Sequence, residues 1–241
     1  PVIVPFLIAA GLGALLGAFN GIFTSRLTVP TLIITLGTAN VFNGFMQGAL
    51  KSVQINTIPS SMQSFGQASL FVAQNRASGL QSAMPVSFLL LVAVVAAAFF
   101  LTRYTMFGRG ILAIGGDEAA AARAGFSVAG TKFWLYVIVG IIAAMAGMVR
   151  TCSMGQMHPT NLLGMEMMVI AAVVLGGTAI TGGKGSLTGV MLGTLLIVIV
   201  QNSMILTGIP TIWQNFALGL LIIVGTGISA VQVARSRGRT A

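Results

Sequence analysis

The acidic side chains of this chain are concentrated in one short segment. Of three Asp and Glu residues among 241, two are adjacent, Asp117 and Glu118, and Arg123 follows them in a segment bounded by glycines, residues 115–125. Hydrophobic residues make up 56% of the chain and charged residues only 6%. Because an ionised side chain is costly inside a membrane, charges in so apolar a chain lie where water reaches them or where they have a function. The polar segment 115–125 is therefore a candidate contact surface for a partner.

Residue types that carry catalysis or bind metals are scarce. The chain has one cysteine, Cys152, and one histidine, His158. A disulfide needs two cysteines, and a zinc site usually needs three or four Cys, His or carboxylate ligands close together. The glycine and lysine run at 182–186 lacks the spacing of a phosphate-binding loop. We therefore expect no catalytic residue, no metal and no directly bound cofactor.

The net charge of +9 does not indicate nucleic acid as a partner. The basic residues are spread singly between apolar stretches, whereas nucleic-acid binding requires a clustered basic patch. A scattered distribution of this kind fits the orientation of a membrane protein better. The expected environment is therefore the lipid bilayer.

The elements that hold the polar segment are expected to be membrane-spanning helices. Crossing the hydrocarbon takes ~20 mostly apolar residues in a helix. We predict an all-α integral membrane fold, a polytopic bundle of about seven transmembrane segments forming one domain over 1–241. The chain opens on Pro1 without methionine or a basic leader, so we expect that N-terminal spans are missing. The predicted spans are 2–24, 29–47, 86–102, 133–149, 165–181, 186–206 and 212–231.

The distribution of basic residues predicts the orientation. If the spans alternate, nine of the 12 Lys and Arg residues fall on one side of the membrane. Because cytoplasmic loops carry the excess of Lys and Arg, the loop 103–132 and the C-terminus are expected in the cytoplasm. The segment 48–85 is then a loop outside, either a lid or partner surface or a passive connector. The nine are Arg26, Arg103, Arg109, Arg123, Lys132, Lys184, Arg235, Arg237 and Arg239, against Lys51, Arg76 and Arg150.

The polar segment has the sequence of a short surface helix. Asp117 is suited to an N-cap, Glu118 complements the positive start of a helix, and Arg123 complements its negative end. Gly125 suits the left-handed conformation that ends many helices. A helix of about two turns is marginal alone in water, so we expect it to rest against another surface. The alternative is an ordinary solvated loop.

Polar and small residues interrupt the second and fifth predicted spans. Asn40 and Asn43 lie in the second, and Gly176 and Gly177 in the fifth. Irregular or polar stretches at membrane depth are tolerated where they are buried in protein or line a cavity. These four residues are therefore candidates for a solute path. Close packing of helices through small residues is the alternative for the glycines.

Glu166 is the only acidic residue outside the polar segment. It is placed at the outer start of the fifth predicted span, where an ionised carboxylate needs water or a partner. It joins the candidates for the solute path, where it would form hydrogen bonds with solute hydroxyls or with a partner loop. The alternative is a hydrated group at the rim of the membrane that pairs with Arg150.

Three motifs follow one another along most of the chain. Thr35-Leu36-Gly37-Thr38 comes first, and 170–178 with 182–186 and Gly189 comes last. Between them stand Phe107-Gly108-Arg109, Ala113-Ile114-Gly115-Gly116, Glu118-Ala119-Ala120, Arg123 and Gly125. In order and spacing the set resembles the permease subunits of bacterial ribose-type monosaccharide ABC importers. In that family the loop matching 103–132 carries a coupling helix that binds an ATPase. The resemblance therefore implies an ATPase-coupling role for Gly108, Arg109, Gly115, Gly116, Asp117, Glu118, Ala119, Ala120, Arg123 and Gly125.

The resemblance also implies partners and a location. The permease would work as a dimer, with a second copy or a paralogue, in the bacterial inner membrane. Cytoplasmic ATP-binding subunits would bind ATP and Mg, so this chain would not itself be an enzyme, and a periplasmic sugar-binding protein would deliver the solute. The expected cargo is a monosaccharide or a similar small polyol.

The chain departs from the family pattern near the expected path. Met167 and Met168 follow Glu166 where the family commonly has another acidic residue, and Asn43 precedes Gly44 where the family usually has arginine. Both changes remove charge, so the sequence does not name the sugar. The alternative function is an ion-coupled secondary transporter of a small polar solute, which normally needs intramembrane carboxylates. An intramembrane enzyme lacks a nucleophile and base pair.

Overall fold

The computed structural model consists of two compact units. Unit 1 comprises Pro1–Ile111 and Ala119–Asn161, and unit 2 comprises Leu112–Glu118 and Leu162–Ala241. The structure describes residues 2–27, 29–51, 53–74, 81–160, 162–179, 182–183, 185–210, 212–214, 216–217, 219–220, 223, 225 and 227.

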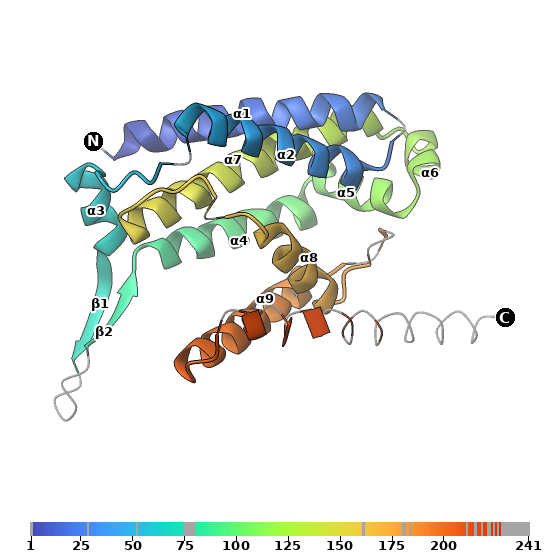
Figure 1. The fold of residues 1–241 in the computed structure, drawn as a ribbon. Coiled ribbons are helices and arrows are strands. Elements are labelled where there is room, and N and C mark those ends of the chain that lie inside the picture. The colour runs from blue at the N-terminus through green and yellow to red at the C-terminus, as the bar shows by residue number, and fades with distance from the viewer. Residues whose placement is uncertain are drawn as a thin grey trace. The chain divides into compact units, whose positions relative to one another are not determined.

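Helices dominate both units (Figure 1). Unit 2 holds the end of α5 (Met106–Gly116), then α8 (Met165–Leu175) and α9 (Leu187–Leu206). Unit 1 holds α1 (Ile3–Arg26), α2 (Thr31–Leu50), α3 (Ser60–Gln67), β1 (Ser69–Gln74), β2 (Gln81–Pro85), α4 (Ser87–Tyr104), the start of α5 (Met106–Gly116), most of α6 (Glu118–Arg123) and α7 (Val128–Met154).

The predicted class of a helical membrane protein is confirmed. Among the described residues, four helices are long and apolar enough to cross a membrane, namely α1, α4, α7 and α9. Helix α2 has 20 residues but carries threonine and amide side chains. Helix α8 has only 11 residues, because the chain turns at Gly176 and Gly177 instead of continuing toward residue 181 as predicted. Much of the seventh predicted span, 212–231, lies outside the described residues.

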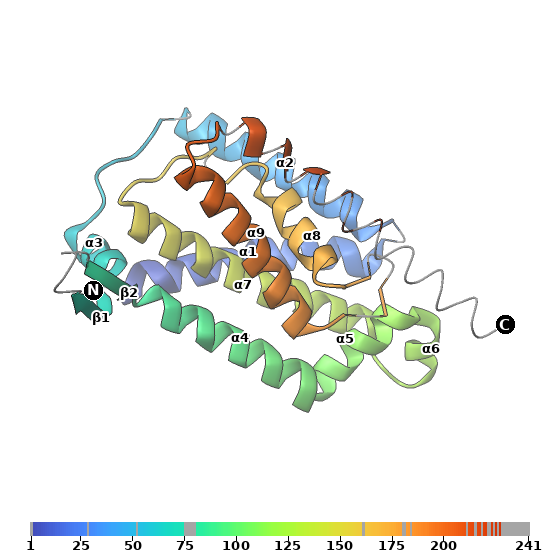
Figure 2. The same ribbon diagram turned by 90° about the horizontal axis from the view of Figure 1, so that it is seen from below.

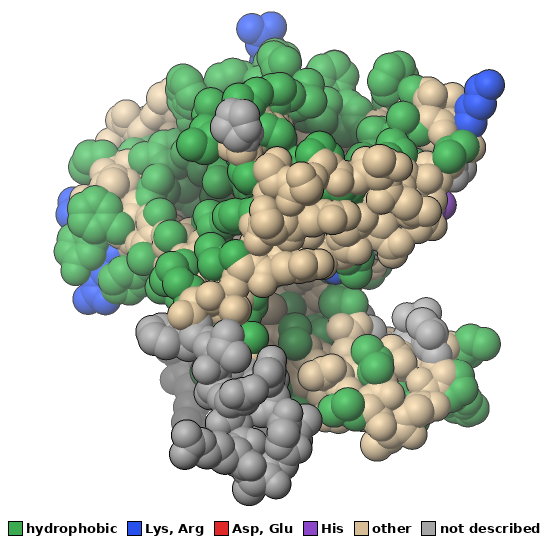
Figure 3. Space-filling model, turned by 90° about the vertical axis from the view of Figure 1, so that its left-hand side faces the viewer, with side chains coloured by type: hydrophobic (Ala, Val, Ile, Leu, Met, Phe, Trp, Pro, Cys, Tyr) green, Lys and Arg blue, Asp and Glu red, His purple; other side chains and the backbone are tan. Residues whose placement is uncertain are grey.

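The surface has the apolar character that lipid requires. Large hydrophobic side chains are exposed along the helices, among them Leu7, Phe45 and Phe100. In Figure 3 hydrophobic side chains cover much of the visible surface, and Lys and Arg side chains project at separate places. A surface this apolar is stable against lipid tails rather than water.

Unit 1 is built on the antiparallel pair α1 and α7, which run side by side (Figure 1). Gly13, Gly17 and Gly21 recur every four residues, which places them on one face of α1. A Cβ atom built at Gly13 would lie 2.6 Å from Cβ of Ala144, and one at Gly17 would lie 3.1 Å from Cα of Val137. Glycine therefore lets the two backbones approach more closely than side chains would allow.

The segment 48–85, expected as an irregular loop, contains α3 and a hairpin of β1 and β2. The hairpin pairs Ser69 with Pro85 and Gln74 with Gln81, with an irregularity between Ser69 and Phe71. Its turn, 75–80, lies outside the described residues. The segment is therefore more regular than its polar sequence indicated, and its role as a lid or partner surface stays a prediction.

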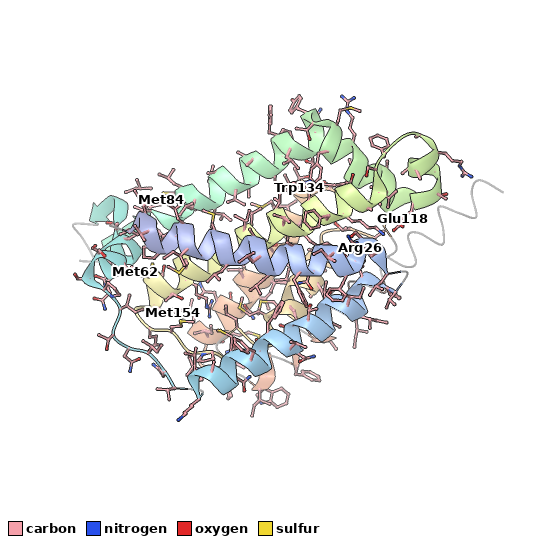
Figure 4. The ribbon with its side chains drawn as sticks, turned by 90° about the horizontal axis from the view of Figure 1, so that it is seen from above. Arg26, Met62, Met84, Glu118, Trp134 and Met154 are labelled. Carbon is pink, nitrogen blue, oxygen red and sulfur yellow. The ribbon has the colours of Figure 1, made fainter. Side chains whose placement is uncertain are left out.

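Helix α3 and the chain before it close one end of the α1 and α7 pair. A Cβ atom at Gly66 would lie 2.7 Å from the backbone nitrogen of Ser153, at the end of α7. Ile55 and Met157 exchange two backbone hydrogen bonds of 2.9 Å. Figure 4 shows Met62 and Met154 together at this end, away from Arg26. We call residues 53–67 with 151–157 the end cap.

Unit 2 is built on the hairpin of α8 and α9, which lie side by side in Figure 2. A Cβ atom at Gly176 would lie 2.7 Å from Cα of Val190, and one at Gly193 would lie 2.8 Å from the backbone nitrogen of Gly176. Ser186 caps α9 by accepting a hydrogen bond of 3.3 Å from the backbone nitrogen of Gly189. Backbone contact through glycine therefore holds α8 and α9 together.

Candidate coupling surface and solute path

A sharp corner between α4 and α5 begins the loop 103–132. Thr105 is extended between the helices, and its hydroxyl donates to the carbonyl of Leu101 and accepts from the backbone N–H of Gly108 at 3.0 Å. A Cβ atom at Gly108 would lie 2.5 Å from Cα of Thr102. Glycine at 108 therefore permits the corner, and Arg109 beside it is exposed on α5.

The predicted short helix is present as α6. It begins at Glu118, directly after Asp117, and ends in two hydrogen bonds that close its last turn. The backbone N–H of Phe126 donates to the carbonyl of Ala121 at 3.1 Å, and that of Gly125 donates to Ala122 at 3.0 Å. Gly125 has φ +90°, the left-handed conformation predicted for it. This paired arrangement is the Schellman helix end.

Helix α6 presents one buried position and several exposed ones. Ala121 is 3% exposed, whereas Glu118, Ala119, Ala120 and Arg123 are all exposed. The helix thus packs through its Ala121 side and offers a surface with an acidic start and a basic end. Glu118 at the start and Arg123 at the end also stabilise the helix, because their charges interact favourably with the helix dipole.

Phe126 ties the end of α6 to its neighbours. A Cβ atom at the buried Gly110 of α5 would lie 3.3 Å from the Phe126 ring and 3.6 Å from the side chain of Thr131 in α7. Ser127 then caps α7 by accepting from the backbone N–H of Gly130 at 3.3 Å. The expectation that the short helix rests against other elements agrees with these contacts.

The remaining coupling candidates, Gly115 and Gly116, contact the loop between α8 and α9. A Cβ atom at Gly115 would lie 3.6 Å from the backbone nitrogen of Gly183, and one at Gly116 would lie 4.0 Å from its Cα. Two motifs far apart in the sequence therefore meet within unit 2. Lys184, next in this loop, lies outside the described residues.

The path candidates Asn40 and Asn43 lie on α2. Asn40 is exposed and donates from its side-chain amide to the carbonyl of Leu36 at 3.0 Å, whereas Asn43 is half-buried. A Cβ atom at Gly37 or Gly44 would meet nothing within 4 Å. Along the helix period these four residues share one side of α2. That side is open in unit 1, as a path-lining surface requires.

The opposite side of α2 contacts α1. The hydroxyl of Thr38 donates to the side-chain oxygen of Asn20 at 2.6 Å, and the rings of Phe19 and Phe42 lie 5.8 Å apart. Asn20 was not among the predicted residues, although its position within an apolar span was a signal for an interhelical hydrogen bond. This contact fixes which side of α2 stays open.

The other path candidates belong to unit 2. Glu166 is exposed in the first turn of α8, and Gly177 has φ +83° with open space at its Cβ position. Gly176 is in close contact with α9, which is the packing role expected as its alternative. Arg150 belongs to unit 1, and its pairing with Glu166 stays a prediction. So does the convergence of the α2 and α8 residues on one path.

Comparison with known proteins places most of the chain, residues 1–225, in one family. The family model described as branched-chain amino acid transport system / permease component matches residues 1–225. The autoinducer 2 import system permease protein LsrC of Klebsiella pneumoniae is 32% identical, over 88% of this chain and 58% of its own length. LsrC of an Enterobacter species is 34% identical, over 91% and 61%.

A further relative is named for the transport of a sugar. The xylose transport system permease protein XylH of Escherichia coli is 27% identical, over 98% of this chain and 73% of its own length. This chain thus spans about three fifths of the length of both LsrC relatives, 58% and 61%. No solved structure matches the chain.

Proposed function

Because this chain belongs to the family of branched-chain amino acid transport system permease components, we infer that it is the transmembrane subunit of an ATP-driven ABC importer. The main observation in support of this inference is the presence of helix α6 at the predicted position. It is a short helix, closed by a Schellman end, with exposed charges, in the loop between α4 and α7. Such a helix suits the cleft of a cytoplasmic ATP-binding subunit, which would bind ATP and Mg.

The proposed cargo is a monosaccharide or a similar small polyol. Relatives named for xylose and autoinducer 2 support a small polar solute, although the family description names amino acids. The open side of α2 supports hydroxyl recognition, because side-chain amides offer both donors and acceptors. The proposed partner outside the membrane is a periplasmic sugar-binding protein near the end cap, and the proposed partner within the membrane is a second permease.

The proposed orientation puts the loop 103–132 and the C-terminus in the cytoplasm. Arg26 ends α1 and Lys132 lies near the start of α7, at one end of that antiparallel pair, whereas Arg150 lies toward the other end. This arrangement supports the orientation that the distribution of Lys and Arg residues predicts. Arg76, Lys184 and the C-terminal residues Arg235, Arg237 and Arg239 lie outside the described residues.

Reconstitution tests the proposed function against its alternative. The full-length protein is placed in lipid vesicles with the ATPase and binding protein of its own operon, and uptake of radiolabelled sugar is measured. We expect uptake that requires ATP and survives a protonophore. Uptake that a protonophore abolishes at constant ATP would establish ion-coupled secondary transport instead.

The solute path on α2 has a test of its own, which uses two adjacent positions. In a background with Cys152→Ala, Gly44→Cys lies on the open polar side, whereas Phe45→Cys replaces a side chain that is 77% exposed on the apolar surface. Because thiols react as thiolates, which form in water, we expect Gly44→Cys to react about tenfold faster with a charged methanethiosulfonate. Saturating sugar should slow only that reaction. Equal rates at the two positions would exclude a water-filled path along this side.

A further inference from the structure

The loop between α8 and α9 makes a backbone-to-backbone contact with the end of α5. Gly182 and Gly183 have φ +86° and +77°, a conformation that favours glycine. A Cβ atom at Gly182 would collide with the carbonyl oxygen of Gly115, and one at Gly183 would lie 3.2 Å from Cα of Gly116. Among the described residues, the two backbones are in direct contact at this point.

The two sides of this contact come from segments far apart in the sequence, although both belong to unit 2. Gly115 and Gly116 end α5, and Glu118 begins α6 two residues later, so the chain joins the contact directly to the candidate ATPase-binding helix. On the other side, the backbone N–H of Gly182 donates to the carbonyl of Ala179 at 3.0 Å. Ala179 follows the end of α8, so the loop is tied to the hairpin of α8 and α9.

The hairpin itself is packed closely enough to move as one body. At Gly176 and Gly193 the backbones of α8 and α9 are in direct contact. Ala171, Ala172 and Ile197 form a buried cluster between the same helices. Closely packed interiors have low compressibility and transmit displacement instead of absorbing it.

We propose that Gly182 and Gly183 are positioning residues through which a displacement of α6 reaches α8 and α9 during transport. The proposal rests on the proposed importer function and adds the route of coupling inside the permease. Movement of α6 on its ATPase shifts the end of α5, and the glycine contact passes that shift to the α8 and α9 hairpin. A Cβ atom at Gly182 would displace Gly115 and so uncouple the two parts.

The test compares two glycines with nearly equal backbone conformations. Gly182→Ala adds a methyl group against the carbonyl of Gly115, whereas Gly164→Ala, with φ +85°, adds one in open space before α8. Alanine is strained to a similar degree in the left-handed conformation at both positions. A difference in transport between the two variants therefore reports the contact of residue 182 with Gly115. The full-length variants are reconstituted with the ATPase and binding protein, and sugar transported per ATP hydrolysed is measured.

We expect Gly182→Ala to co-purify with its ATPase and to hydrolyse ATP, but to transport about tenfold less sugar per ATP, within the range of coupling between sites. Gly164→Ala should transport as the unaltered protein does. Equal transport per ATP in the two variants would overturn the proposal while leaving the importer function intact. If the unaltered permease binds no ATPase, the proposed function and this inference both fail.

A second measurement covers the case in which Gly182→Ala does not fold. In the Cys152→Ala background, Gly116→Cys and Gly183→Cys would stand close enough for a disulfide, since the Cβ position of each residue lies 3.2 to 4.0 Å from Cα of the other. A contact that transmits movement persists through the cycle, so the disulfide should form both without nucleotide and in the vanadate-trapped state. Formation in one state only, or in neither, would overturn the proposal.

Discussion

Replacing Gly17 with leucine is expected to disrupt the packing of α1 against α7 and to lower the thermal stability of the protein strongly. Gly17 packs against the backbone of Tyr136 and Val137, and a Cβ atom there would lie 3.1 Å from Cα of Val137. Overpacking a core costs typically about 1–3 kcal/mol when side chains can shift, and a backbone cannot shift so readily. The expected loss is at or above the top of that range.

Thermal unfolding in detergent measures this effect, with Gly11→Leu as the matched control. Gly11 lies on the same helix, and its Cβ position has nothing within 4 Å. A substitution in such open, lipid-facing space should change the free energy of unfolding by no more than about 0.5 kcal/mol. Equal melting temperatures for the two variants would show that the α1 and α7 contact does not hold unit 1 together.

Reversing the charge of Arg123 is expected to abolish uptake through loss of the ATPase. Arg123 is exposed at the end of α6, where the proposed cleft would enclose it. Truncating one member of a buried charge pair costs about 2–5 kcal/mol, and every 1.4 kcal/mol is tenfold in affinity, so Arg123→Glu should weaken ATPase binding at least about tenfold. The cost to α6 itself through the helix dipole is only about 0.3–1 kcal/mol.

The measurement is the affinity of the full-length permease for its ATPase in detergent, followed by uptake in vesicles. Arg123→Lys keeps the charge and is the matched control, expected to retain most of the affinity. Undiminished binding and uptake in Arg123→Glu would remove α6 from the coupling surface. A parallel fall in thermal stability would mean that the substitution acts through folding instead.

Local features of this fold were predictable from the sequence. The long apolar helices followed from hydropathy, because α1, α4, α7 and α9 each contain a stretch of mostly apolar residues long enough to cross a membrane. Helix α6 followed from capping residues, since Gly125 at its end required a left-handed conformation that the structure has. Such features depend on neighbours within a few residues, and those neighbours are read directly from the sequence.

Features that depend on distant contacts were not predictable in the same way. The spacing of Gly13, Gly17 and Gly21 was visible, but their partner on α7 depends on which helices pair. The contact of Gly115 with Gly182 joins two motifs whose separation in sequence hides their proximity. The short length of α8 was missed because its apolar composition continues past Gly176, whereas the backbone turns there to meet α9.

Cross-linking from α6 tests the central claim, that this helix binds a cytoplasmic ATPase, most directly. In the full-length Cys152→Ala protein, Ala122→Cys lies on the exposed side of α6, whereas Ser64→Cys is exposed on α3 in the end cap. Each is labelled with a thiol-reactive benzophenone and irradiated in the assembled transporter. We predict an adduct with the ATPase from Ala122→Cys and none from Ser64→Cys. An ATPase that cross-links equally from both positions, or from neither, would contradict the account.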